Sequence, residues 1–371
     1  MRATGALLCI LFYGLLANGL RADETATRPL APGLQQAIEA AVKRDLAAYG
    51  GRDPVPGAVV GVWAPDKGIF VRGFGLSDLS PRRAMAIDDH FRIGSNTKTF
   101  VVTLLLQLVD EKKLSLDDTV AKFDIGVTVP NADRMTLRDL ARMQSGIVDA
   151  YSVPAVQKIN MTAEVKITPR ELITIAASVP PLFAPGTKWN YSNTNYLLLG
   201  LIIEAVTHDR IEREIERRIL GPLALTQTSF PTTDPGMPKP YAHGYMLDDH
   251  SNWVDNTTVM PPSLTWAAGV MISDMADMKR WVKAYVTGAT NSVATQRERL
   301  SCVPTGQMSL RFGLGIGCAA GWYGYTGGMS GYNTAAYYLP EKDATIIAFV
   351  NTQTLDSKTP GPANTIFRDI A

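Results

Sequence analysis

A serine and a lysine three residues apart are the side chains of this sequence whose types and spacing could do chemistry together. Ser95 and Lys98 precede a segment, Phe100 to Val109, that is apolar almost all the way round a helix, a pattern typical of a buried helix. On such a helix the two groups share one face, about one turn apart. A lysine entering a buried helix is costly to keep charged, so its pKa should fall and its amine can accept a proton. The serine beside it then becomes a nucleophile.

The same pair has a simpler interpretation. Ser-x-x-Lys alone is a weak signal, because most chance matches are exposed polar residues at a helix start. The apolar continuation argues against a solvated Lys98, and the segment is too short to span a membrane. If the helix forms, its N-terminus adds N–H donors and partial positive charge near any oxyanion formed at Ser95.

A second cluster, Tyr191 and Asn193, comes just before another strongly apolar segment at residues 197–206. A tyrosine phenol held near a lysine can have its pKa lowered and can relay protons. Asn193 offers a donor and an acceptor to a substrate amide. The alternative is that Tyr191 packs at the helix entry while Ser192 or Asn193 caps the helix.

A third cluster, Tyr325, Thr326, Gly327 and Gly328, falls on an expected strand. Glycine within a strand often marks a place where a ligand approaches the backbone. Such a strand edge could donate an N–H to an oxyanion while Thr326 offers a hydroxyl. The alternative is a glycine-rich hairpin without a ligand.

Composition narrows the class of protein. The chain has 371 residues, of which 46% are hydrophobic, enough for one large domain or two smaller ones. A net charge of +1 gives no reason to expect nucleic acid or an anionic membrane as a partner. The four histidines are scattered, so no metal-ligand cluster is visible. There is no Gly-x-Ser-x-Gly elbow, no dinucleotide fingerprint and no P-loop.

The N-terminus has the pattern of a secretory signal peptide over residues 1–22, with a basic start, an apolar centre and a cleavage position at Ala22. This predicts a periplasmic or secreted protein without stable membrane insertion; a retained anchor is the alternative. Residues 23–33 are expected to form a flexible leader. Cys302 and Cys318 then remain, either as a disulfide or as two buried thiols.

Residues 34–371 are predicted to form a single α+β domain, with strands from both chain ends in one antiparallel sheet and a helical lobe at about 117–262. A cleft between the two parts is where a site is expected, with the long loop at 231–262 as a wall. Periodicity predicts helices at residues 34–48, 136–143, 168–177, 197–206, 211–219 and 273–286, the last capped by Ser273. Strands are predicted at residues 58–63, 69–74, 311–317, 322–326, 334–339 and 344–351.

Together and in this order, the three clusters resemble the motifs of the class C β-lactamase and serine D,D-peptidase superfamily, the penicillin-recognising serine hydrolases. The resemblance runs from about residue 34 to residue 351. Its motifs are the segment 91–98 with Ser-x-x-Lys, the Leu-Ser-Leu-Asp-Asp at 114–118, the segments 136–146 and 185–193, and the glycine-rich segments at 268–269, 312–315 and 327–332.

The resemblance implies roles for the matching residues. Ser95 would be acylated, Lys98 would be its base, and Tyr191 would pass the proton to the leaving group and later activate water. Asn193 would contact the substrate amide, and the backbone N–H groups of Ser95 and Gly328 would form the oxyanion hole, with Thr326 and Gly327 lining the same strand. No metal or organic cofactor is implied.

The sequence departs from the family pattern at the start of the third motif. Relatives usually have lysine or histidine where this chain has Tyr325, and a phenol cannot hold a substrate carboxylate as a cation does. Met143 stands where many relatives have histidine; we interpret that position as structural.

The expected function is that of a secreted serine hydrolase with a small-molecule or peptide substrate, most like a D-alanyl-D-alanine carboxypeptidase acting on cell-wall peptides. A carboxylesterase or amidase with the same machinery, or a weak β-lactamase, is the alternative within the class. A non-catalytic protein that keeps the penicillin-binding fold is the alternative outside it. The oligomeric state is left open.

Overall fold

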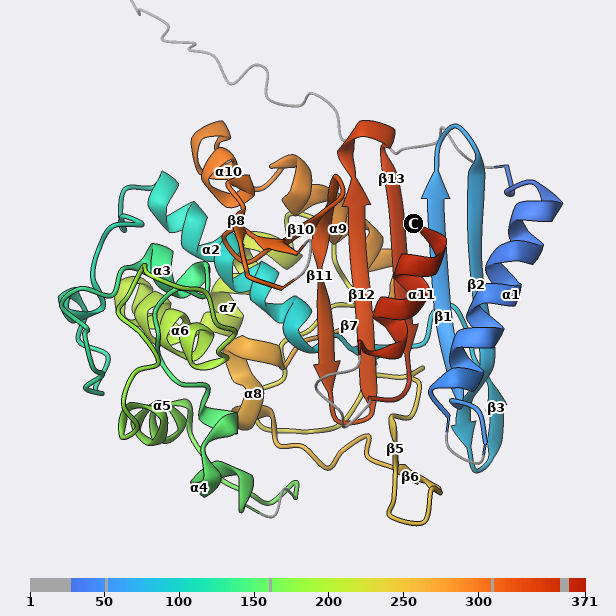
Figure 1. Ribbon diagram of the computed structural model, residues 1–371, viewed down its shortest axis with the longest axis horizontal. Coiled ribbons are helices and arrows are strands. Elements are labelled where there is room, and N and C mark those ends of the chain that lie inside the picture. The colour runs from blue at the N-terminus through green and yellow to red at the C-terminus, as the bar shows by residue number, and fades with distance from the viewer. Residues whose placement is uncertain (1–27, 51–52, 160–161, 308–309, 354–359) are drawn as a thin grey trace, which may run out of the picture.

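The structure, a computed structural model, describes residues 28–50, 53–159, 162–307, 310–353 and 360–371. An antiparallel sheet stands beside a mainly helical lobe (Figure 1), which confirms the predicted α+β fold. The expected signal segment and Cys9 lie outside the described residues. Within the described ranges the sheet has nine strands in the order β3-β2-β1-β13-β12-β11-β10-β9-β8. Their bounds are β1 Gly57–Ala64, β2 Gly68–Leu79, β3 Arg82–Ala84, β8 Val303–Pro304, β9 Arg311–Phe312, β10 Gly317–Ala319, β11 Trp322–Met329, β12 Tyr332–Leu339 and β13 Ala344–Val350.

The two ends of the chain meet in the middle of this sheet. Val60 of β1 lies opposite Arg72 of β2 on one side and Ala348 of β13 on the other. Both β1 and β13 are rich in small and β-branched apolar residues, the composition of strands covered on both faces. The prediction of one sheet built from distant parts of the chain is therefore confirmed.

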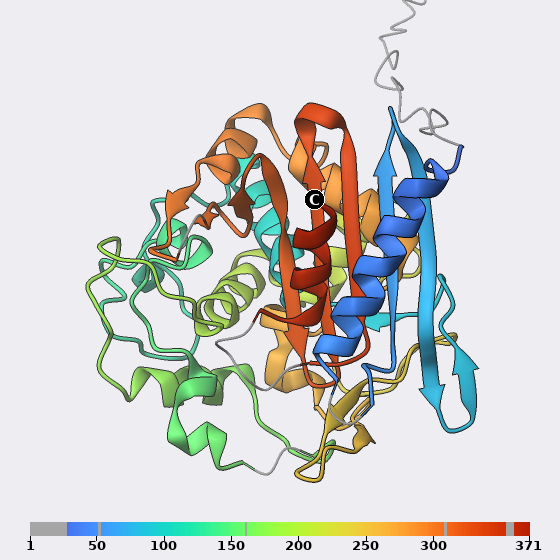
Figure 2. The ribbon, with the colours of Figure 1, turned by 45° about the vertical axis from the view of Figure 1, so that its right-hand side comes forward.

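Helices cover both faces of the sheet. α1 (Pro32–Ala48) and α11 (Pro362–Ile370) pack on one face, as the turned view shows (Figure 2), while α9 (Met275–Thr287) lies against the other. Leu30 is buried and its N–H donates to the carbonyl of Ile69. The end of the predicted leader is thus packed against the sheet, and α1 begins at Pro32 because proline is pre-organised for a first helical turn.

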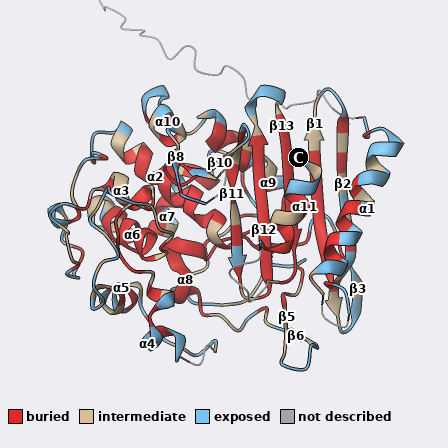
Figure 3. Cartoon of the chain, viewed as in Figure 1, coloured by how far each residue is buried: buried red, intermediate tan, exposed pale blue. Residues whose placement is uncertain are grey.

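The helical lobe is built around α2 (Thr97–Asp110), which is buried on almost every side (Figure 3). Trp281 of α9 stacks on Phe100 of α2 with ring centroids 3.9 Å apart, and its indole N–H donates to the Thr99 hydroxyl. Within the described ranges the other helices are α3 Leu137–Ala141, α4 Pro154–Gln157, α5 Pro169–Ala177, α6 Thr194–Thr207, α7 Ile211–Ile215, α8 Pro262–Gly269 and α10 Val293–Leu300. Among the described residues, none of the helices has the length and apolar character of a membrane span.

Several predicted boundaries are wrong for local reasons. The cap of α9 is Asp274 rather than Ser273, because the Asp274 carboxylate accepts the N–H of Asp277. The helix expected at 211–219 continues after Ile215 as a π-helical turn. The strand expected at 311–317 is two short strands, β9 and β10, paired with each other.

The disulfide Cys302–Cys318 links the chain just before β8 to β10. Of the two alternatives for this cysteine pair, the disulfide is therefore the one found.

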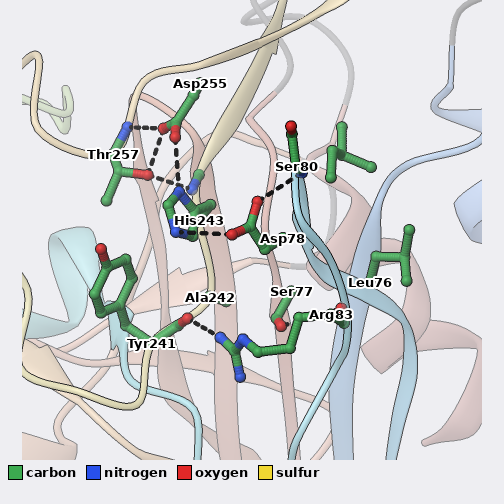
Figure 4. A network of polar contacts seen from close by, with 12 residues as sticks. Leu76, Ser77, Asp78, Ser80, Arg83, Tyr241, Ala242, His243, Asp255 and Thr257 are labelled. Carbon is green, nitrogen blue, oxygen red and sulfur yellow. Dashed lines mark hydrogen bonds and ion pairs between the residues drawn. The ribbon is translucent and has the colours of Figure 1, made fainter.

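The long loop at 231–262 is not structureless. It contains a small hairpin of β5 (Tyr245–Leu247) and β6 (Trp253–Asp255), and a polar network ties it to β2 (Figure 4). His243 lies between two carboxylates, with Nδ1 2.7 Å from Asp255 Oδ2 and Nε2 3.4 Å from Asp78 Oδ2. Asp255 also accepts the N–H and the hydroxyl of Thr257. These contacts hold the loop beside the sheet.

We expect Asp255→Ala to lower the free energy of unfolding by about 1–2 kcal/mol, because Thr257 and His243 both lose their acceptor. Urea denaturation would measure the change. Val254→Ala is the matched control, since the neighbouring Val254 side chain is 45% exposed and its truncation should have little effect. Equal stability of the Asp255 variant and the wild type would show that this network does not hold the loop.

Candidate active site

Ser95 lies in a tight turn pressed against the sheet. The turn is a 3₁₀ segment, Gly94–Asn96, that leads directly into α2. Gly94 has φ of 51°, and a Cβ there would lie 2.8 Å from the backbone nitrogen of Gly328 on β11. A Cβ on Gly327 would overlap the carbonyl oxygen of Ile93. Glycine is therefore required on both sides for the turn and the strand to come this close.

The structure brings the first two predicted clusters into one hydrogen-bonded group. Lys98 Nζ lies 3.0 Å from Ser95 Oγ, 2.8 Å from Asn193 Oδ1 and 2.6 Å from the carbonyl oxygen of Ala268. The Tyr191 hydroxyl is 2.8 Å from Ser95 Oγ on the other side. Asn193 makes no side-chain cap to α6, so the capping alternative is wrong for this residue. The serine hydroxyl thus lies between an amine and a phenol.

Burial controls the protonation of both neighbours of Ser95. Lys98 is 0% exposed, and desolvation lowers the pKa of its amine to about 7, against an opposing attraction from Asp149. Burial raises the pKa of the Tyr191 phenol, and the hydrogen bond with Ser95 offsets this only in part. The expectation of a lowered tyrosine pKa is therefore wrong. Lys98 can accept a proton near neutral pH, whereas Tyr191 stays a neutral phenol that can donate and accept hydrogen bonds.

A pocket with a volume of about 900 Å³ opens over this group. Its lining includes the apolar side chains of Val156, Ile159, Met260 and Leu264; of these, Met260 belongs to the loop at 231–262. The lining also includes five residues of β11: Tyr325, Thr326, Gly327, Gly328 and Met329. The amide side chains in the lining outside β11 include Asn333, Gln353 and Asn364. None of the described residues that line the pocket carries a formal charge. Within the described ranges no group of three or more His, Cys, Asp or Glu side chains could hold a metal ion.

The third predicted cluster lies at this pocket, which argues against a ligand-free hairpin. Thr326, Gly327 and Gly328 line it along the part of β11 that faces Ser95. Tyr325 is 4% exposed, with its ring edge-on to Phe312. Its hydroxyl interacts with Tyr191 but makes no hydrogen bond of normal geometry to any described atom. It supplies no positive charge to the pocket.

Two residues near the reactive group were missed by the sequence analysis. Asp149 accepts a hydrogen bond from Asn193 Nδ2 at 2.9 Å. Gln353 lies against β11. A Cβ built on Gly328 of that strand would be 2.7 Å from Gln353 Nε2. No spacing rule connects either residue with Ser95, because each is far from it in sequence. An aspartate just after the apolar Ile147-Val148 pair is the one local signal for Asp149.

Comparison with known proteins identifies the family. The family model described as Beta-lactamase matches residues 35–366. The chain belongs to this family. Protein flp of Staphylococcus aureus is 29% identical over 260 residues, which cover 67% of this chain and 48% of that protein. A putative penicillin-binding protein PbpX of Bacillus subtilis is 27% identical over 286 residues, covering 76% and 67%. The chain therefore spans about half the length of the first of these relatives.

Solved structures of this superfamily of serine hydrolases have the same fold. A D-stereospecific amidohydrolase from Streptomyces sp. superposes with a TM-score of 0.76 at 29% identity, covering 89% of this chain and 96% of that one. A D-amino acid amidase from Ochrobactrum anthropi has a TM-score of 0.78 at 22% identity, covering 90% and 98%. At that lower identity the second likeness shows the fold alone.

The protonation of Lys98 predicts a pH profile for acylation. We expect kcat/KM for p-nitrophenyl butyrate to rise with pH through an apparent pKa of about 7, because the amine must be neutral to accept the Ser95 proton. Initial rates from about pH 5 to about pH 9 would measure it. Lys98→Ala should lose nearly all activity. A flat profile, or full turnover in that variant, would show that Lys98 is not the base.

The close approach of the Ser95 turn to β11 predicts that Gly327→Ala is inactive. Its new Cβ must push the turn away from the strand, and a displacement of about 1 Å costs on the order of 100-fold in rate. The readouts are kcat/KM and the thermal midpoint. Gly317→Ala on β10 is the matched control, since its Cβ would meet ordinary contacts of 3.4 Å or more. Retained activity in the Gly327 variant would contradict the required contact.

Proposed function

We propose that the protein hydrolyses amides or esters that lack a free carboxylate, through an acyl-enzyme on Ser95. The lining of the pocket carries this proposal. Its described side chains offer hydroxyls and amides but no cation. Tyr325 stands where the motif of the resembled family usually begins with lysine or histidine. A carboxylate placed there would be desolvated without a charged partner among the described residues of the lining, which is costly. A substrate without a carboxylate avoids that penalty.

The proposed reaction uses the group around Ser95. The Ser95 hydroxyl attacks the substrate carbonyl and gives its proton to Lys98, while the carbonyl oxygen becomes an oxyanion. The backbone N–H groups of Ser95 and Gly328 stabilise that oxyanion. Tyr191 carries the proton from Lys98 to the leaving amine or alcohol, and later orients the water that attacks the ester at Ser95. Asn193 contacts the substrate amide.

Amides of D-amino acids or of peptides ending in them are the substrate class we favour. The Streptomyces protein, 29% identical over most of this chain, is a D-stereospecific amidohydrolase, which supports the assignment. The D-alanyl-D-alanine carboxypeptidase role expected from the sequence requires a pocket that accepts a free carboxylate, so it ranks second. The expected export to the periplasm or medium is part of the proposal, and the Cys302–Cys318 disulfide supports it, because such bonds persist in oxidising compartments.

A matched pair of peptides separates the two roles. Both end in D-alanyl-D-alanine and differ only in the C-terminus, a free carboxylate in one and a carboxamide in the other. We expect kcat/KM to be at least about tenfold higher for the carboxamide, since about 1.4 kcal/mol of uncompensated charge corresponds to that factor. Liquid chromatography of the released product would measure both rates.

The controls for this pair use the whole mature protein. Ser95→Ala should abolish turnover of both peptides and any adduct seen by intact mass after incubation with a fluorescent penicillin. Faster cleavage of the free carboxylate would favour the carboxypeptidase. An absence of turnover and of adducts with peptides, p-nitrophenyl butyrate and penicillin would favour the non-catalytic binding protein.

A further inference from the structure

Asp149 contacts the group around Ser95 through the side chain of Asn193. It precedes the short 3₁₀ segment Ala150–Ser152, and its Oδ1 accepts the backbone N–H of Tyr151 at 3.2 Å. Its Oδ2 accepts a hydrogen bond from Asn193 Nδ2 at 2.9 Å. Asp149 is not among the residues that line the pocket. It can therefore act on the reaction only through its neighbours.

The contact with Asp149 determines how the Asn193 amide is oriented. With Nδ2 donating to the carboxylate, Oδ1 points to Lys98 Nζ at 2.8 Å. The reversed amide would place its oxygen against the carboxylate and its N–H groups against the amine. The first contact would be repulsive, and the second would be repulsive whenever Lys98 is an ammonium. A carboxylate at position 149 thus holds the amide oxygen as an acceptor for Lys98.

The charge of Asp149 also reaches Lys98. Other groups around the amine are neutral: the hydroxyl of Ser95, the Tyr191 ring centred 5.1 Å from Nζ, and the Tyr196 ring at 5.3 Å. Tyr325 adjoins Tyr191 and is also a neutral phenol with a raised pKa. Asp149 is the charged group that acts on Lys98 in the described part of the chain. Burial raises the pKa of Asp149 itself, while the bonds from Tyr151 and Asn193 oppose that shift.

We propose that Asp149 is a positioning residue for acylation: it holds Asn193 in the orientation that binds Lys98, and it balances the ammonium that forms on Lys98. This inference rests on the proposed function of Ser95 and Lys98. In the step concerned, the Ser95 oxygen bonds to the electrophile and its proton moves to Lys98 Nζ. A positive charge then appears on an amine that is 0% exposed. The Asp149 carboxylate, which is linked to Lys98 through the side-chain amide of Asn193, stabilises that charge.

The experiment measures the rate at which a fluorophosphonate labels Ser95 as a function of pH, in the whole mature protein. In that reaction the serine oxygen bonds to phosphorus, fluoride leaves, and the proton goes to Lys98. The probe needs no knowledge of the natural substrate. If the wild type is not labelled, the proposed function and this inference both fall. If it is labelled, the variants test Asp149 alone.

Asp149→Asn keeps the size of the side chain and removes the charge. We expect two changes in the pH profile of labelling. The rate on the alkaline plateau should fall about tenfold, because the forming ammonium loses its counter-charge. The acid limb should move to lower pH by on the order of one unit, because removing a nearby negative charge lowers the pKa of an amine.

Asp274→Asn is the matched control. Asp274 also caps a helix through a backbone N–H, and burial also raises its pKa, but it contacts none of the reactive residues. This variant should lose some stability and keep the wild-type pH profile. A purely structural role for Asp149 would lower the plateau without moving the acid limb, and that result, or an unchanged profile, would overturn the proposal.

A double-mutant cycle tests the route through Asn193. If Asp149 acts by holding Asn193, the effects of Asp149→Asn and Asn193→Ala on the plateau rate should not add. The Asn193→Ala change already removes the side-chain amide that Asp149 orients. Additive losses would show that Asp149 does not act through the amide. The thermal midpoint of each variant confirms that a folded protein is being compared.

Discussion

The structure depends on one costly arrangement, a lysine amine enclosed at the start of a buried helix. Taking Lys98 out of water lowers the pKa of its amine, and three acceptors from separate elements hold it in place: Ser95 from its own turn, Asn193 from the start of α6, and the Ala268 carbonyl at α8. Each element must therefore be fixed to within a few tenths of an ångström. The packed helical lobe supplies that rigidity.

The sheet contributes what the helices cannot, a stretch of backbone without a neighbouring strand. β10 pairs with β11 only as far as Gly324, so the strand beyond that point is open on the side of Ser95. The turn at Gly94 occupies this edge instead of another strand. Glycines at 94 and 327 allow the contact, and the pocket lies along the seam between sheet and helices.

Local patterns predicted much of this, and tertiary contacts explain what they missed. The Ser95–Lys98 spacing on an apolar helix predicted a buried lysine beside the serine, because both facts are local. The direction of the Tyr191 pKa was predicted wrongly, since it depends on how completely other segments enclose the phenol. Asp149 was missed because its role exists only once a loop and α6 come together. Boundaries such as that of α9 were misplaced because two neighbouring residues could each have capped it.

The pairing of β1 with β13 has a consequence for how the molecule is made. These partners are separated by almost the whole described chain, from Val59 opposite Phe349 to Trp63 opposite Thr345. A sheet of such long-range contacts forms slowly and late. The helical lobe lies between the partners in sequence, so it can collapse while the last strands are still missing. β11, which lies beyond β12 from β13, completes the pocket, so a nascent chain passes through its early stages before the pocket has formed.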